Sequence, residues 1–360
     1  MNETVTLNIV EKMTVTSSND IQTNDDIITS CFVFDFSVEF VLFGFLCVFG
    51  IAGNATFIYF LLRETRQTVT HLLLTWLAMA DIGFLLCAIP LRVFATAVQT
   101  WNLEALKTSF PYIVKFIFPL SMLFQMFSIY MTLLLALTRF VALQVPRFAR
   151  FCTRRFTRFN VVAVFVFCAC VNIPRFVEYE LVQHADPDTN KTQVVAQETE
   201  FARSTCYRVI YSFLIYCVIM FLVPLTSLSY INFRLYTFVR QQVVDDKQRS
   251  GERDVTRSLV AIVIVFIVCQ LPAVVTQLLQ VSLTAEQMVC PSAFFYYARI
   301  SDTCVVINSV VNVIIYAACV SHFRKRMREA LCCFRQEVED QMEVELKHTD
   351  TAEVNTVNEL

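Results

Sequence analysis

Long apolar stretches separated by short polar connections dominate the pattern along the chain. Seven of these stretches hold about 20 residues or more, which is enough for a helix to cross a hydrocarbon layer of roughly 30 Å. They cover residues 37–62, 69–93, 110–142, 159–178, 207–239, 255–280 and 293–319. None alternates apolar and polar residues as barrel strands do, so the pattern predicts an all-α bundle of seven transmembrane helices.

The polar segments divide the chain into four parts. Residues 1–36 precede the first span, and residues 37–320 hold the transmembrane domain. Residues 321–334 contain a short basic amphipathic stretch, which predicts an eighth helix on the membrane surface. Residues 335–360 are polar and acidic, which predicts a disordered cytoplasmic tail.

Cys332 and Cys333 lie at the end of the amphipathic stretch. Palmitoylation at these positions would attach the predicted eighth helix to the lipid of the inner leaflet. The alternative is an unmodified pair of cysteines.

Composition supports the membrane interpretation and excludes other classes of protein. Hydrophobic residues make up 56% of the 360 residues and charged residues 17%, against about 45–50% and 25% in ordinary soluble domains. The net charge of −2 gives no basic field that would recruit nucleic acid. No HExxH, GxxxxGK[ST], GxGxxG or GxSxG motif occurs, so we expect no enzyme.

Basic residues in the connections predict the orientation in the membrane. Of the 29 Lys and Arg residues, 20 lie in or beside the connections after the first, third, fifth and seventh spans, and such residues favour the cytoplasmic side. We therefore expect a plasma-membrane protein with its amino terminus outside. Asn2 and Asn190 begin Asn-X-Thr acceptors on segments that this orientation places outside, so we expect both to be glycosylated.

Three cysteines fall on the outer side in this orientation, where disulfides persist. They are Cys31, Cys206 and Cys290. Three thiols cannot all pair, and the sequence leaves the connectivity open.

Polar residues inside the spans are candidate functional groups, because burial in hydrocarbon makes them costly. Asp81 lies in the middle of the second span. With Ser128 of the third span and Asn308 and Asn312 of the seventh, it could bind water or a small hard cation, and we expect a sodium ion at Asp81. The alternative is that these residues only hold neighbouring helices together.

Short motifs on successive spans resemble those of a known protein family. Gly53-Asn54, Leu77-Ala78-Met79-Ala80-Asp81, Thr138-Arg139-Phe140, Pro224, Cys269-Gln270-Leu271-Pro272 and Asn312-Val313-Ile314-Ile315-Tyr316 follow one another along the chain. In this order they resemble the rhodopsin-like G-protein-coupled receptors over about residues 37–334. The segment Asn172-Ile173-Pro174-Arg175-Phe176 is similar to the invertebrate FMRFamide-type neuropeptide receptors.

The resemblance implies roles at the inner side of the bundle. Arg139 would contact a heterotrimeric G protein in the active state, while arrestin and a receptor kinase would act on the tail. The acid that usually precedes this arginine is Thr138 here, so we expect Glu252 to restrain Arg139 or basal signalling to be raised. The family's packing switch and seventh-span motif correspond to Ile129, Pro224, Phe266 and Tyr316.

The resemblance also bears on the outer half of the bundle. The third-span cysteine of the family, expected near Val114, is missing, so Cys206 lacks its usual partner. Ser121 stands where amine receptors have an acid, and no lysine lies near Val306 to hold retinal, so neither a monoamine receptor nor an opsin is expected.

An amidated peptide is the ligand that these positions favour. The expected pocket is lined by Met122, Gln125, Gln277, Tyr297 and Asp302, below a loop that carries Glu178. Because carboxylates pair bidentately with guanidinium groups, Asp302 and Glu178 are expected to anchor the arginine of an Arg-Phe-amide terminus. An ion pair with Arg175 is the alternative for Glu178, and a divergent chemosensory receptor for a small molecule is the alternative function.

Overall fold

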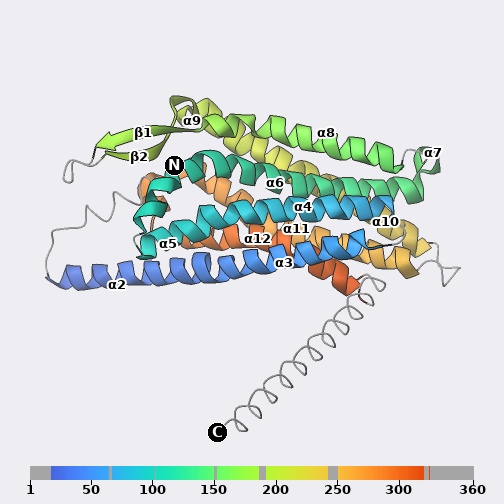
Figure 1. Cartoon of the computed structure of the whole chain (residues 1–360), viewed down its shortest axis with the longest axis horizontal. Coiled ribbons are helices and arrows are strands. Elements are labelled where there is room, and N and C mark those ends of the chain that lie inside the picture. Colours follow the sequence, from blue (N-terminus) through green and yellow to red (C-terminus); the bar gives the residue numbers. More distant parts are fainter. Residues whose placement is uncertain are drawn as a thin grey trace, which may run out of the picture.

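The computed structural model describes residues 18–64, 67–101, 103–149, 152–185, 192–241, 250–319 and 324. Within this part of the chain, seven helical spans that are long and apolar enough to cross a membrane form one bundle (Figure 1). They cover Ile27–Leu62, Val69–Trp101, Leu106–Gln144, Arg154–Val177, Tyr207–Phe238, Val260–Gln280 and Ala293–Tyr316. The prediction of an all-α bundle with seven spans is therefore confirmed.

Most spans combine several helical elements. The first consists of α2 (Ser18–Asp35), the π-helical η1 (Phe36–Leu42) and α3 (Phe43–Leu62), and the second of α4 (Val69–Ala88), η2 (Ile89–Val93) and α5 (Phe94–Trp101). The third is α6 (Glu104–Gln144), followed by α7 (Pro146–Ala149), and the fourth is α8 (Arg154–Asn172) with η3 (Ile173–Val177). The remaining elements are α9 (Glu200–Arg203), η4 (Tyr207–Ile215), η5 (Cys217–Leu222), α10 (Val223–Gln241), α11 (Ser250–Ser282), η6 (Ala285–Met288) and α12 (Ala293–Cys319).

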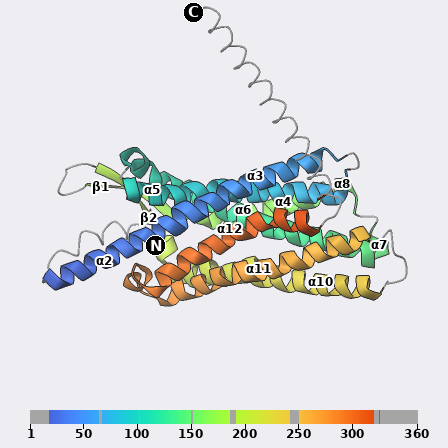
Figure 2. The same cartoon turned by 90° about the horizontal axis from the view of Figure 1, so that it is seen from below.

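The helix of the first span begins earlier than the apolar pattern predicts. Figure 2 shows α2 and α3 as one continuous rod along the bundle. Asp35 and Glu39 interrupt the apolar pattern, yet both are buried beside Arg299 of the seventh span. The helix can therefore continue through these acids, because a cation on a neighbouring helix compensates them.

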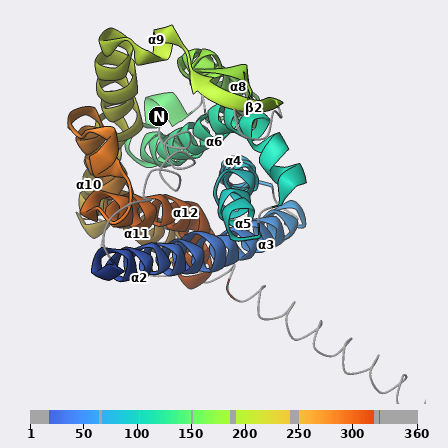
Figure 3. The ribbon, with the colours of Figure 1, turned by 90° about the vertical axis from the view of Figure 1, so that its left-hand side faces the viewer.

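A two-stranded antiparallel hairpin marks one end of the bundle. Strands β1 (Tyr179–Ala185) and β2 (Thr192–Glu198) follow the fourth span, with Tyr179 opposite Glu198. The hairpin packs against α6, as the view along the bundle in Figure 3 shows. We call this the hairpin end of the bundle. The other end, where α6 terminates at Gln144, is called the opposite end.

Close packing joins the first, second and seventh spans near the middle of the bundle. Gly50 of α3 faces Leu85 and Val310, which are almost fully buried. A methyl group added at Gly50 would lie 2.7 Å from a carbon of each. Around Gly53, one turn further along the same helix, nothing lies within 4 Å of such a group.

These two glycines give a matched test of the packing. Gly50→Ala is expected to lower the free energy of unfolding by about 1–3 kcal/mol, because the neighbours are buried and cannot move aside. Gly53→Ala should leave it unchanged or raise it by up to about 1 kcal/mol through helix propensity. The measurement is the melting temperature of both variants in detergent. Equal melting temperatures would contradict the packing described here.

Candidate functional site

A buried polar cluster surrounds Asp81 in the middle of the bundle. The Ser128 hydroxyl on α6 donates a hydrogen bond of 2.5 Å to Asp81 Oδ1. The Asn312 amide on α12 donates one of 3.0 Å to Asp81 Oδ2. The structure thus brings together three of the four residues that the sequence groups here, while Asn308 lies half-buried one turn away on α12.

Asn54 connects the same region to the first span. Its side-chain amide donates to the Gly50 carbonyl at 2.9 Å and to the Ser309 carbonyl of α12 at 3.3 Å. Four helices, α3, α4, α6 and α12, are therefore held together by polar contacts within an apolar surrounding.

The oxygen atoms of this cluster bear on the expected sodium ion. Asp81 and Ser128 present carboxylate and hydroxyl oxygens, which are the ligands that a hard cation prefers. Asn312 directs its N–H group to the carboxylate, and would have to present its carbonyl oxygen instead. In their present orientation, Asp81 and Ser128 therefore fit a sodium ion, whereas Asn312 does not.

At the opposite end, Arg139 lies close to the seventh span. Tyr316 is buried, stacks on Phe57 with ring centroids 5.7 Å apart, and lies near enough to Arg139 for electrostatic interaction. The Thr138 hydroxyl donates to the Leu134 carbonyl of its own helix at 2.7 Å. Thr138 is thus turned to its own backbone and does not replace the missing acid.

Glu252 belongs to α11, but its side chain lies outside the part of the structure that is described. Its expected pairing with Arg139 stays a prediction. The three residues of the expected packing switch, Ile129, Pro224 and Phe266, are all buried. The ring of Phe266 stacks on that of Phe221 in the fifth span, with centroids 6.4 Å apart.

At the hairpin end, Glu178 is held by three groups. Arg175 lies 2.8 Å from Glu178 Oε1, and the Tyr207 hydroxyl donates to the same oxygen at 2.6 Å. The backbone N–H of Thr199 donates to the Glu178 carbonyl at 2.9 Å. The ion pair with Arg175, one of the two alternatives for this residue, is the arrangement observed.

The disulfide of the hairpin end joins Cys31 to Cys290, with Cα atoms 6.2 Å apart. It connects the first span to the segment between the sixth and seventh. Cys206 is exposed and is a free thiol. The loop after the fourth span is therefore held by the contacts of Glu178 and by the packing of its hairpin on α6, and Cys206 forms no disulfide.

Serine substitutions distinguish the two kinds of cysteine. Cys31→Ser and Cys290→Ser are each expected to lower the free energy of unfolding by about 2–4 kcal/mol, because the long closed loop is released. Cys206→Ser should have no effect. Surface expression and melting temperature check this, and a loss with Cys206→Ser equal to that with Cys31→Ser would refute the assignment.

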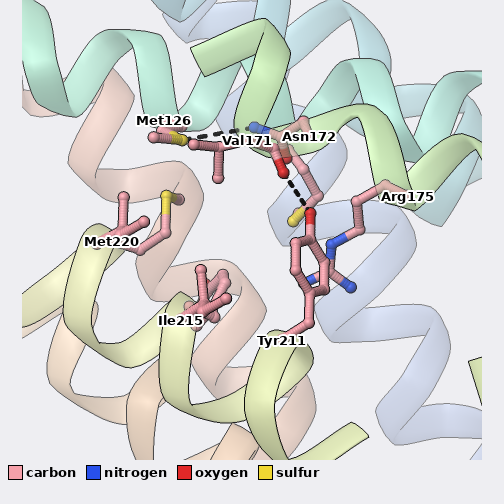
Figure 4. Close-up of a pocket in the computed structure, with 10 residues that line it drawn as sticks. Met126, Val171, Asn172, Arg175, Tyr211, Ile215 and Met220 are labelled. Atoms are coloured by element: carbon pink, nitrogen blue, oxygen red, sulfur yellow. Dashed lines mark hydrogen bonds between the residues drawn. The ribbon is translucent and has the colours of Figure 1, made fainter. Parts of the chain in front are cut away.

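A small cavity lies between the third, fourth and fifth spans. Figure 4 shows Met126 and Met220 on one side of it and Tyr211 and Arg175 on the other. Met122, expected to contact ligand, also lines this cavity, as does Tyr216. The Arg175 guanidinium lies over the Tyr211 ring at 5.3 Å, and Glu178 compensates its charge.

Five charged residues form a network at the hairpin end, which we call the charge network. Arg92 of η2 lies 2.5 Å from Asp302 of α12, and both side chains are about one third exposed. Arg299 lies 2.9 Å from Asp35 and 3.8 Å from Glu39. The sequence predicts Asp302 as a site residue but not the other four members of the network. A charged residue that interrupts an apolar span is the signal that could have identified them.

The other residues of the expected pocket occupy three helices. Gln125 is buried in α6, and Gln277 is half-buried in α11. The Tyr297 hydroxyl on α12 donates to the Pro272 carbonyl at 3.2 Å. Tyr297 therefore ties the seventh span to the proline of the sixth.

Several expectations lie outside the described residues. These are glycosylation at Asn2 and Asn190, palmitoylation at Cys332 and Cys333, the eighth helix over 321–334 apart from Arg324, and the tail over 335–360.

Comparison with known proteins agrees with this architecture. Residues 53–316 match the 7 transmembrane receptor (rhodopsin family). The chain is 26% identical to the FMRFamide receptor of Drosophila melanogaster over 299 residues, which is 81% of this chain and 53% of that receptor. It is 28% identical to the FMRFamide peptide receptor frpr-18 of Caenorhabditis elegans over 307 residues, 79% of this chain and 67% of that one.

Receptors for other peptides are similar too. Identity to somatostatin receptor type 5 of Rattus norvegicus is 24% over 301 residues, covering 82% of this chain and 78% of that receptor. The chain spans about half the length of the fly receptor.

Proposed function

This chain belongs to the rhodopsin family of seven-transmembrane receptors, and from this premise we propose that its ligand is a short neuropeptide ending in Arg-Phe-amide. The family consists of receptors, so the chain is not an enzyme. With seven helices that can span a membrane, it is a multi-pass plasma-membrane protein. Its relatives support a receptor of the neuropeptide type. Peptide binding would shift the bundle to a state that activates a heterotrimeric G protein.

The hairpin end faces the outside in this proposal. The basic connections after the odd-numbered spans support that orientation. In the sequence, the acceptor at Asn190 falls between the segments that form β1 and β2. From here on we call the hairpin end the outer end.

The charge network is the observation that carries the proposal. It contains three carboxylates and two guanidinium groups, so it has an excess negative charge on the side from which ligand would enter. Asp302 is its accessible acid, with 31% of the side chain exposed. A peptide arginine at Asp302 would compensate the excess charge.

We assign the amidated phenylalanine to the small cavity beside Met122, which has to widen to admit the ring. Methionine side chains adapt readily to an aromatic ring, and three of them line this space. Because Glu178 neutralises Arg175, the cavity has no spare positive charge for a free carboxylate. A neutral carboxamide avoids that cost. Tyr216 lines the same cavity.

The inner end would bind the signalling partners. We assign the G-protein contact to the region of Arg139 and Tyr316, with Glu252 as a restraint on Arg139. Arrestin and a receptor kinase would act on the tail, and membrane lipid would surround the palmitoylated eighth helix. A sodium ion at Asp81 and Ser128 would stabilise the inactive arrangement of α4, α6 and α12, the helices that carry Asp81, Ser128 and Asn312.

The experiment that tests this function is a peptide panel on cells that express the full chain and a general G-protein reporter. Amidated Arg-Phe peptides should give a saturable response at nanomolar to micromolar concentration. Silence of a receptor shown by antibody to be at the surface would count against the proposal.

One observation favours the second candidate, a chemosensory receptor for a small molecule. Gln270 of the sixth span is 3% exposed, and its amide nitrogen has no hydrogen-bond acceptor. A small ligand with an acceptor oxygen could satisfy it. A response to small acceptor molecules together with silence to the peptides would favour this reading.

A further inference from the structure

In the charge network, the carboxylate whose oxygens accept no hydrogen bond is not the one that a ligand can reach. Glu39 is 1% exposed, and neither of its carboxylate oxygens accepts a hydrogen bond. Its nearest ion-pair partner, Arg299, is 3.8 Å away and lies closer to Asp35, at 2.9 Å. A buried carboxylate in such a setting is costly unless a cation approaches it.

Arg92 connects this buried acid to the accessible one. It contacts Asp302 at 2.5 Å and also acts electrostatically on Glu39. Its element η2 packs against η1, which carries Glu39. The Arg92 side chain is about one third exposed, whereas the Glu39 side chain is enclosed. Arg92 can therefore change partners by a movement of its own flexible side chain.

We propose that Glu39 determines the specificity of the receptor for a cationic ligand by accepting Arg92 when the ligand takes Asp302. This inference rests on the proposed function. In the free receptor, two guanidinium groups serve three carboxylates. When the peptide arginine pairs with Asp302, Arg92 turns to Glu39, and three cations then face three carboxylates. Glu39 is a positioning residue here, since it acts on the ligand only through Arg92.

The number of charges in the network predicts an effect of Glu39→Gln that a merely structural role of Glu39 would not produce. Glu39→Gln leaves two carboxylates and two guanidinium groups, so the network is neutral without ligand. Arg92 then stays on Asp302, and the peptide arginine must compete with it. The loss falls on peptides with a guanidinium group and spares those without one.

The test measures binding of two peptides to the full chain on cells. The probes are Phe-Met-Arg-Phe-amide and the same peptide with neutral citrulline in place of arginine. The ratio of the two affinities is compared in wild type, Glu39→Gln, Arg92→Gln and the double variant, with surface expression measured for each. Glu39→Gln is expected to reduce the arginine preference about tenfold, within the usual range of coupling between sites.

The double variant keeps the test decisive if Glu39→Gln reaches the surface poorly. Since Glu39 acts only through Arg92, Arg92→Gln and the double variant should show the same arginine preference within about threefold. An unchanged preference in Glu39→Gln, an equal loss for both peptides, or a further loss in the double variant overturns the inference. A wild-type receptor that binds both peptides equally would instead refute the proposed function.

Discussion

Replacing Asp302 by asparagine is expected to raise the peptide concentration for a half-maximal response about 10- to 100-fold, the range for a hydrogen bond to a charged group. Asparagine keeps the shape and one acceptor oxygen but loses the charge that pairs with the peptide arginine. The response to the citrulline peptide should change little. Concentration–response curves of both peptides check this.

Glu180→Gln is the matched control, because it removes one carboxylate from the exposed face of β1 at the same end of the bundle. If the outer acids acted only through their general field, both variants would lower potency equally. That outcome, with equal surface expression, would argue against Asp302 as the anchor.

The second large effect concerns the amide at the end of the peptide. Wild type is expected to prefer the amidated peptide over its free acid, because the Arg175–Glu178 pair leaves the cavity neutral. Glu178→Gln keeps an acceptor for Tyr207 but frees the Arg175 charge to pair with a peptide carboxylate. The preference for the amide should then fall by about tenfold or more, as expected for a charge-assisted pair.

Competition binding of the amidated and free-acid peptides measures this preference. Tyr207→Phe serves as a control, since it removes one hydrogen bond to Glu178 without changing the charge of the cavity. An amide preference that Glu178→Gln leaves intact would contradict the role of the cavity. If Glu178→Gln instead abolished the preference for arginine over citrulline, Glu178 would be the arginine anchor.

The spans and the polar centre could be predicted from the sequence because their signals are local. Twenty or more apolar residues in succession predict a membrane helix wherever the partners lie. Asp81 stands out in the same way, since an acid in the middle of such a run is costly and needs donors. Ser128 and Asn312, at matching depth in other spans, are the donors observed.

The outer end could not be predicted to the same extent, because its contacts join residues far apart in the chain. The three outer cysteines allow three pairings, and only the structure shows that Cys31 meets Cys290, 259 residues away. The pairing of Arg92 with Asp302 is likewise invisible in either span alone. The helix over α2 was missed because Asp35 and the polar residues before Cys31 end the apolar run, although Arg299 compensates Asp35.

The strands β1 and β2 were missed for a different reason. They lie in a polar loop with no run of alternating apolar residues, and their register is set by pairing with each other and by packing on α6. The loop could be placed by its neighbouring spans, but its shape could not.

The most direct test of the proposed peptide recognition is the affinity of the wild-type receptor for three peptides measured side by side. These are Phe-Met-Arg-Phe-amide, its citrulline analogue and its free acid. The analogue and the free acid are each expected to bind at least about tenfold more weakly than the amidated peptide, since each loses one charge-dependent interaction. Equal affinity for all three, or no binding by receptor present at the surface, would contradict it.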